Sequence, residues 1–117
     1  DNDSYLEYQI GLAYYDDLDK YVEQANEYML RAYEHSNNDA LFYLGYCNFF
    51  MQKLEESEKY FMLLRENCKE NNRADVDSYY RMGQIYIMRK EYDKALEDTK
   101  TALQVAKDSK YKMNNYY

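Results

Sequence analysis

Apolar positions recur along the chain every three or four residues, which is the period of an α-helix. One such stripe consists of Leu41, Leu44, Gly45 and Asn48, and the next of Leu54, Ser57, Phe61 and Leu64. Asn and Asp clusters at 37–39 and 71–75 separate the periodic segments and supply helix-stop and N-cap side chains. The pattern predicts six helices, at about 4–16, 20–36, 39–52, 55–70, 75–90 and 92–108.

Ser4-x-x-Glu7 has the spacing of a capping box, in which each side chain bonds the other residue's free amide at a helix start. We therefore expect Ser4 to be the N-cap of the first helix.

Each of the three glycines, Gly11, Gly45 and Gly83, falls inside a predicted helix, and they are spaced 34 and 38 residues apart. A glycine within a helix costs about 1 kcal/mol relative to alanine. Close approach of a second helix backbone would account for this cost. We therefore expect each glycine to contact the second helix of its own helical pair.

The residues around the glycines also repeat. Tyr79-x-x-Met82-Gly83-x-x-Tyr86 is followed by Ala95, Thr99 and Ala102, and related residues surround Gly11 and Gly45. This pattern resembles the tetratricopeptide repeat, which has the consensus W-x2-L-G-x2-Y…A-x3-F…P and a period of 34 residues. Two extra residues in the turn at 16–19, and about four near 71–75, bring the three units into phase.

The resemblance implies an all-α fold, an α-solenoid (a right-handed superhelix) of three tetratricopeptide-like antiparallel helix pairs. We expect one repeat domain over residues 1–117, with units at about 1–37, 38–73 and 74–110. Residues 111–117 would begin a further unit or a capping helix. The chain opens without methionine, and we expect it to be a fragment of a longer protein.

A helical wheel centred on each glycine predicts which face could bind a partner. Positions six and two before the glycine, and one and five after it, lie opposite the contact within the pair. In stacked helix pairs this face lines the concave side, the usual binding surface of solenoids. Its residues are Tyr5, Gln9, Leu12, Asp16, Asp39, Tyr43, Tyr46, Phe50, Asp77, Arg81, Gln84 and Met88.

The middle unit places three large aromatic residues, Tyr43, Tyr46 and Phe50, on this face. Exposed aromatic patches mark contact sites, since rings give much contact area with few rotatable bonds. The same patch could instead be covered by the segment after Lys110 or by a second copy of the chain. At the edges of the stripe, six residues are expected to pack one unit against the next: Tyr8, Tyr15, Phe42, Phe49, Tyr80 and Ile87.

Charge narrows the choice of partner. The chain carries 22 acidic and 15 basic side chains, a net charge of −7. Residues 1–37 hold nine acidic and two basic side chains, and therefore the whole excess. This balance argues against a nucleic-acid partner, which requires clustered lysine and arginine. The acidic end is either a solvated helix surface or a region that attracts a basic partner or the lysine-rich tail of another copy.

The sequence contains no recognisable catalytic or metal-binding motif. The two cysteines, Cys47 and Cys68, are predicted to be free thiols, because antiparallel helices would hold them about 13 Å apart in register. His35 is the only histidine, and we expect it to be solvated or hydrogen-bonded at a helix end. The longest nearly apolar run, 41–51, is too short to span a membrane.

These observations predict a non-catalytic scaffold, without cofactor or metal, that binds a protein or peptide in the concave groove of a repeat array. The alternative is a structural or regulatory segment of a larger signalling protein, stabilised by neighbouring repeats or self-association, with no groove ligand. We expect no nucleic-acid partner and no membrane insertion, and a homo-oligomer remains open. The segment would be a soluble domain in a cytoplasmic or extracytoplasmic part of its parent protein.

Overall fold

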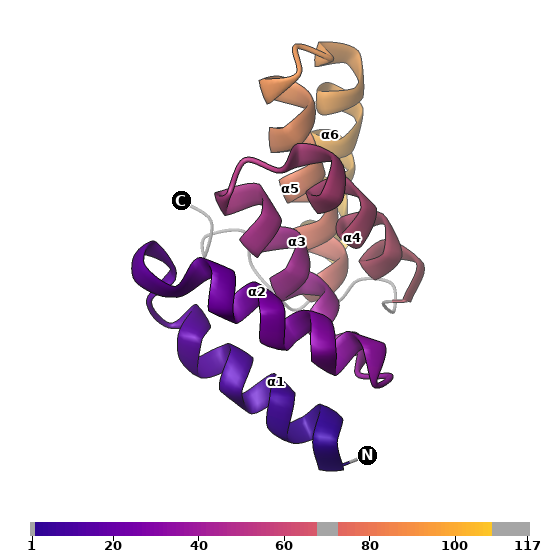
Figure 1. Ribbon diagram of the computed structural model, residues 1–117. Helices are drawn as coiled ribbons and strands as arrows, with labels where there is room; N and C mark the ends of the chain where they lie inside the picture. The colour runs from indigo at the N-terminus through magenta and orange to yellow at the C-terminus, as the bar shows by residue number, and fades with distance from the viewer. Residues whose placement is uncertain (1, 68–72, 109–117) are drawn as a thin grey trace. The chain divides into compact units, whose positions relative to one another are not determined.

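The computed structural model describes residues 2–67 and 73–108, and they form six α-helices and one short 3-10 helix (Figure 1). The elements in chain order are α1 (Asn2–Tyr15), α2 (Leu18–Glu34), η1 (Asn38–Ala40), α3 (Leu41–Phe50), α4 (Leu54–Asn67), α5 (Arg73–Met88) and α6 (Tyr92–Asp108). The helices pack as antiparallel pairs, α1 with α2, α3 with α4, and α5 with α6. The predicted all-α fold of paired helices is confirmed.

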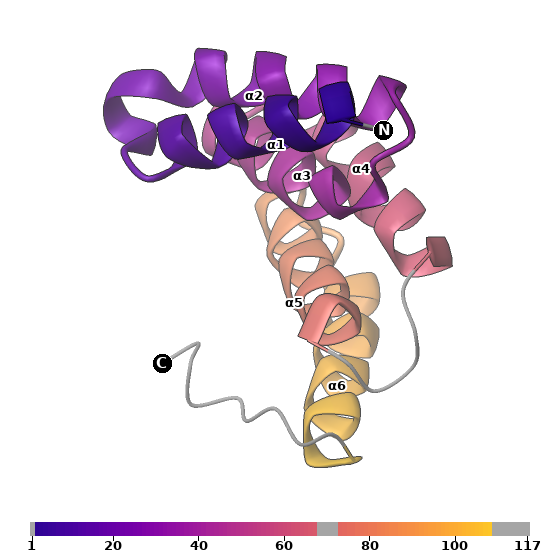
Figure 2. The same cartoon turned by 90° about the horizontal axis from the view of Figure 1, so that it is seen from below.

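The chain divides into two compact units, residues 1–60 and 61–117, and α4 passes from the first to the second. In the first unit, α1 and α2 lie side by side and antiparallel (Figures 1 and 2). Its core forms where Met29 and Ala32 of α2 meet Ala40 and Leu44. Partly buried side chains surround this core cluster: Tyr8, Leu12, Leu30, Tyr33, Tyr43 and Tyr60.

In the second unit, α5 and α6 lie side by side (Figure 2). Small residues line the buried face of α6, at Ala95, Ala102 and Ala106. Arg65 of α4 contacts both helices of this pair: its Nη2 donates to Asp98 Oδ2 at 3.2 Å, and its guanidinium lies 3.8 Å from the centroid of the Tyr79 ring. One side chain therefore joins α4, α5 and α6.

The glycines meet the second helix of their own pairs, as predicted. A Cβ atom added at Gly11 would lie 3.0 Å from Met29 Cε, and one added at Gly83 would lie 2.7 Å from Thr99 Oγ1. The buried Gly45 contacts α4 through its carbonyl, which accepts a hydrogen bond from Ser57 Oγ at 2.7 Å.

Three helices end in the same way, with a left-handed residue that is not glycine. Ser36, Gln52 and Lys90 follow α2, α3 and α5 with φ values of 75°, 62° and 63°. In each case the amide of this residue donates to the carbonyl three residues earlier, and the next amide donates to the carbonyl five residues earlier. This is the Schellman motif, which satisfies the last carbonyls of a helix.

The predicted capping box is wrong. Helix α1 already includes Asn2, so Ser4 lies inside the helix, where it is buried. The Glu7 carboxylate is hydrogen-bonded to His35 and so is not committed to the helix start. The local motif matched in sequence, but the chain becomes helical before it.

The turn predicted between the first two helices is present at Asp16 and Asp17. Shortly after it, Tyr21 near the start of α2 has non-helical angles, with φ −127° and ψ 23°, and kinks the helix. The expected cap before the third helix is also present, since the Asn37 side chain accepts a hydrogen bond from the Asp39 amide at 3.0 Å. Cys68, the insertion near Asn71 and the expected helix at 111–117 lie outside the described residues.

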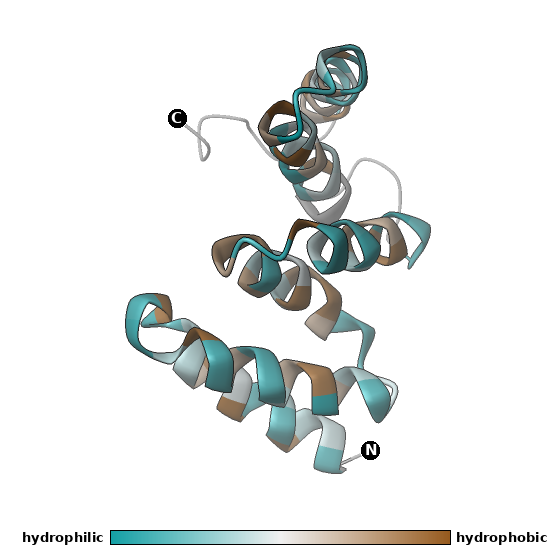
Figure 3. Ribbon diagram, turned by 45° about the horizontal axis from the view of Figure 1, so that its top comes forward, coloured by the Kyte–Doolittle hydropathy of each residue, from teal (hydrophilic) through white to brown (hydrophobic). Residues whose placement is uncertain are grey.

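Hydrophilic and hydrophobic residues alternate around most helices, as the colouring of Figure 3 shows. Within residues 2–67 and 73–108, no helix combines the length and apolar character needed to cross a bilayer.

Candidate functional site: an aromatic cluster on α1 and α3

Six aromatic residues gather where α1 meets α3 in the first unit. This aromatic cluster consists of Tyr8, Tyr15, Phe42, Tyr43, Tyr46 and Phe49. The ring of Tyr43 is central, because it contacts Tyr15 at 4.8 Å and Tyr8 at 5.9 Å between centroids, both nearly edge-on. Edge-to-face packing is favoured because the positive edge of one ring meets the negative face of the other.

Tyr46 extends the cluster along α3. Its ring stacks against Phe42 at 6.3 Å and Phe49 at 6.1 Å, and it reaches Tyr15 of α1 at 6.1 Å. Tyr15 therefore links Tyr43 and Tyr46. The sequence had assigned Tyr8 and Tyr15 to contacts with the following helix pair, and their contacts with α3 confirm this.

The proposed binding residues of the first unit differ in their exposure. Tyr43 and Tyr46 are partly buried, whereas Phe50 is 41% exposed at the end of α3. Leu12 packs against the core cluster. The remaining proposed residues, Tyr5, Gln9 and Asp16, are exposed on α1 and the turn after it. The cluster thus has a partly buried centre bordered by exposed side chains.

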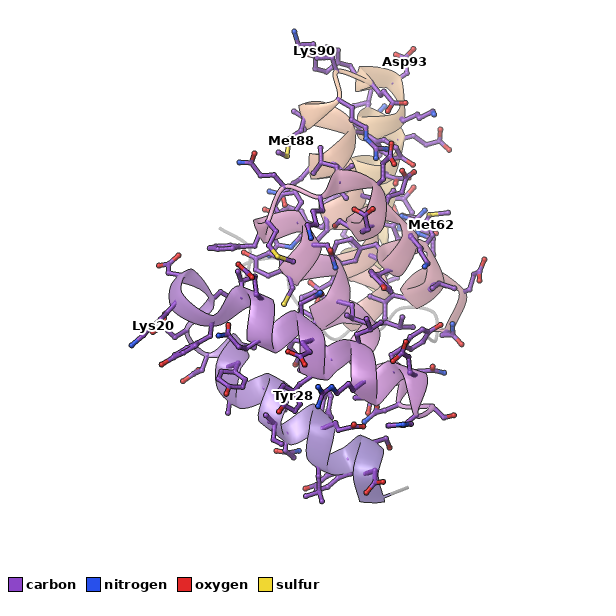
Figure 4. The ribbon with its side chains drawn as sticks, in the orientation of Figure 1. Lys20, Tyr28, Met62, Met88, Lys90 and Asp93 are labelled. Carbon is purple, nitrogen blue, oxygen red and sulfur yellow. The ribbon has the colours of Figure 1, made fainter. Side chains whose placement is uncertain are left out.

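In the second unit, the proposed residues lie on α5. Arg81 Nη1 donates to Gln84 Oε1 at 2.9 Å, and the Arg81 guanidinium lies 5.0 Å from the centroid of the Tyr80 ring. Met88 is exposed near the end of α5, and its side chain and that of Lys90 point outward (Figure 4). Asp77, which the helical wheel had placed on the same face, is buried.

The partly buried Tyr8 of the cluster carries no charge. Burial raises the pKa of Tyr8 well above its ordinary value, and the neighbouring Tyr43 raises it further through proximity and a hydrogen bond. Tyr8 therefore remains a neutral phenol at physiological pH. Its hydroxyl acts as a hydrogen-bonding group and not as a base.

Burial also lowers the reactivity of a nearby thiol, that of Cys47. Cys47 is free and buried in α3, and burial raises its pKa to about 12. Because the thiolate is the reactive form, this cysteine is unreactive in the folded protein.

Sequence reasoning missed the partner of His35. This histidine caps the end of α2, and its Nδ1 lies 2.6 Å from Glu7 Oε1 on α1. The hydrogen bond to Glu7 is the main cause of a raised His35 pKa. The antiparallel pairing of the first two helices would have been the clue, since it brings the start of one beside the end of the other.

The described side chains were searched for groups that could bind a metal ion. In the parts of the chain that the structure describes, no group of three or more His, Cys, Asp or Glu residues could hold a metal ion.

Comparison with known proteins identifies one of the helix pairs. Residues 76–109 match the family model of the tetratricopeptide repeat. The matched segment contains Gly83 and Thr99, the residues of the close contact between α5 and α6. The comparison with curated proteins found no match. The resemblance seen in the sequence is thus confirmed for this repeat, whose family typically binds proteins and is generally non-catalytic.

Proposed function

We propose that this chain, in which residues 76–109 are a tetratricopeptide repeat, is a non-catalytic scaffold that binds a segment of another protein through the aromatic cluster and Phe50. The exposure of Phe50 is the observation that carries the proposal. Phe50 lies at the end of α3, directly after the cluster, and is 41% exposed, so a bound partner that covered it could supply about 1 kcal/mol of additional burial.

The surroundings indicate the chemistry of the partner. Partly buried tyrosines offer flat contact area and hydroxyl groups, while the exposed Asp16 and Asp39 add negative charge. Residues 1–37 have a net charge of −7. A peptide segment with apolar side chains and flanking lysine or arginine would complement both features.

A displayed random-peptide library selected on the immobilised protein tests the proposal. Enriched peptides are then measured for affinity against the wild type, Phe50→Ser and the control Tyr92→Ser, which removes an exposed ring from α6. We expect Phe50→Ser to weaken binding about tenfold or more, as loss of an aromatic anchor does. Tyr92→Ser should change affinity less than about twofold.

Circular dichroism would verify that both variants keep the helical fold. Failure to enrich any peptide would contradict the proposal and favour the structural-segment alternative. Enriched peptides that bind Phe50→Ser as tightly as the wild type would move the binding site away from α3.

A further inference from the structure

The first helix presents apolar side chains away from its own pair. Leu6 is 56% exposed and Ile10 is 42% exposed, and Ala13 on the same side is also exposed. These positions lie five before, one before and two after Gly11. Helix α1 therefore packs one side on α2 and leaves a second apolar side open, which is here called the α1 face.

The corresponding positions in the other two pairs are closed. Counted from Gly45 and Gly83, they are Ala40, Leu44, Cys47, Ser78, Met82 and Ile85, each with 0% exposure. Among the three described pairs, only the first leaves this face open. A surface that the repeat buries elsewhere is therefore exposed on α1 among the described residues.

The structure shows what covers this face in the second pair. Ala40 and Leu44 pack against Met29 and Ala32 of α2, the second helix of the preceding pair. Beside them, Asn48 Nδ2 donates to Asn26 Oδ1 at 3.0 Å. The natural cover for the α1 face is thus a helix that corresponds to α2.

Helix α6 is such a helix, and its own docking side is open. Met29 meets Gly11 as Thr99 meets Gly83, and this fixes the correspondence between α2 and α6. The α2 residues Asn26, Leu30 and Tyr33 then correspond to Leu96, Lys100 and Leu103. Leu30 and Tyr33 pack on the core cluster. Leu96 and Leu103 are 55% and 44% exposed, and together with Lys100 they form the α6 face.

The differences between the internal contact and the two open faces favour their joining each other. The polar partners Asn26 and Asn48 correspond to Leu96 on α6 and Tyr14 on α1, so a leucine and a tyrosine ring replace the hydrogen-bonded amide pair. The exposed Lys100 adds a positive charge to the α6 face, whereas residues 1–37 carry the net charge of −7. Both faces therefore present apolar side chains, and the lysine of the α6 face would meet a helix pair of net negative charge.

We infer that copies of this chain associate head to tail, with α6 of one molecule occupying on α1 of the next the place that α2 occupies on α3. The two faces are unlike, so the contact is heterologous and adds further copies instead of closing as a symmetric pair. The occupant of each face is thus a second copy of the chain.

Sedimentation velocity from about 1 µM to about 1 mM tests this inference on the full chain, since weak self-association falls in that range. The wild type should show a mass that rises with concentration beyond a dimer. Two variants each disable one face, Leu6→Gln/Ile10→Gln on α1 and Leu96→Gln/Leu103→Gln on α6. Each alone should remain a monomer. A mixture of the two should form a dimer and stop there, because only one working face of each kind is present.

A matched control, Met62→Gln/Ile87→Gln, changes two exposed apolar residues outside both faces and should associate like the wild type. Circular dichroism would show that all variants are folded. A wild type that stays monomeric throughout would overturn the inference. So would association that survives loss of the α6 face, which would indicate a symmetric α1-to-α1 dimer, or a mixture of the two face variants that does not associate.

Discussion

At Gly83, the absence of one methyl group sets how closely α5 and α6 approach. In Gly83→Ala the new Cβ would lie 2.7 Å from Thr99 Oγ1, so we expect a loss of about 1–3 kcal/mol of stability, despite the roughly 1 kcal/mol that alanine gains in helix propensity. In a Thr99→Ala background the obstructing oxygen is gone, and the next atoms lie at 3.7 and 3.8 Å. There the same change should be neutral or stabilising, as urea unfolding of the double-mutant cycle would measure.

Thr101→Ala serves as the control background, because it removes a hydroxyl from the same helix that bonds only the Glu97 carbonyl. Gly83→Ala should remain destabilising there. An equal cost in the Thr99→Ala and Thr101→Ala backgrounds would show that the contact with Thr99 does not select glycine.

The glycine contacts and the packing of Tyr8 and Tyr15 on the next helix pair could be predicted from sequence, whereas the Glu7–His35 contact and the partial burial of Tyr43 could not. A glycine inside a helix is costly and therefore calls for a packing reason. The Glu7–His35 hydrogen bond joins residues 28 positions apart. Neither residue is unusual at its place in or next to a helix, so the sequence does not signal this contact. Likewise, a helical wheel drawn for α3 alone predicts the face of the helix on which Tyr43 lies. It does not show how near Tyr8 and Tyr15 of α1 come, and their rings help to bury Tyr43 beside the core cluster.

At the scale of helices, the left-handed residues at Ser36, Gln52 and Lys90 are sites of avoidable strain. A side chain in this conformation costs about 1 kcal/mol or more, which glycine does not incur. We expect Gln52→Gly and Lys90→Gly each to raise stability by about 0.5–1 kcal/mol, measured as an increased urea midpoint at unchanged slope.

Gln52→Ala is the control, because alanine keeps the Cβ atom that makes a positive φ costly and loses only the rest of the side chain. It should leave the urea midpoint nearly unchanged. If Gln52→Gly gave no more stability than Gln52→Ala, the conformation at position 52 would not be a source of strain.

The same residues explain where the sequence misjudged the helices. The predicted ends at 36, 52 and 90 coincide with the left-handed residues, while the helices end at Glu34, Phe50 and Met88. Glycine usually marks such a helix end. None of these three positions is glycine, so the sequence pattern placed each helix end two residues too late. The helices themselves were predictable because their apolar period is regular over many turns.

At the scale of the whole molecule, the uneven charge should act on the rate of association. Asp16, Asp17 and Asp19 are exposed at the turn between α1 and α2. Changing all three to asparagine should slow association with a basic peptide several-fold at low salt, and salt should reduce the difference, because screening acts over about 8–10 Å. Stopped-flow measurements over a series of salt concentrations would give these rates, and the unfolding midpoint should hardly change.

A triple change of Glu55, Glu56 and Glu66 to glutamine removes the same charge from exposed positions on α4. We expect a smaller effect on the rate from this control. If both triple variants slowed association equally, net charge alone would govern encounter, and the acidic turn would have no special part in it.

The burial of Cys47 makes α3 a natural reporter of its own opening. A thiol that is inaccessible and has a pKa near 12 reacts with an alkylating reagent only while α3 is loosened, so its labelling rate counts opening events. Mass spectrometry of the modified peptides separates this rate from that of Cys68. Because α3 also bears the aromatic cluster, a ligand bound there would lower the labelling rate in proportion to the fraction of sites left unoccupied. The labelling rate of Cys47 in the unmodified protein thereby measures how often its proposed binding surface opens.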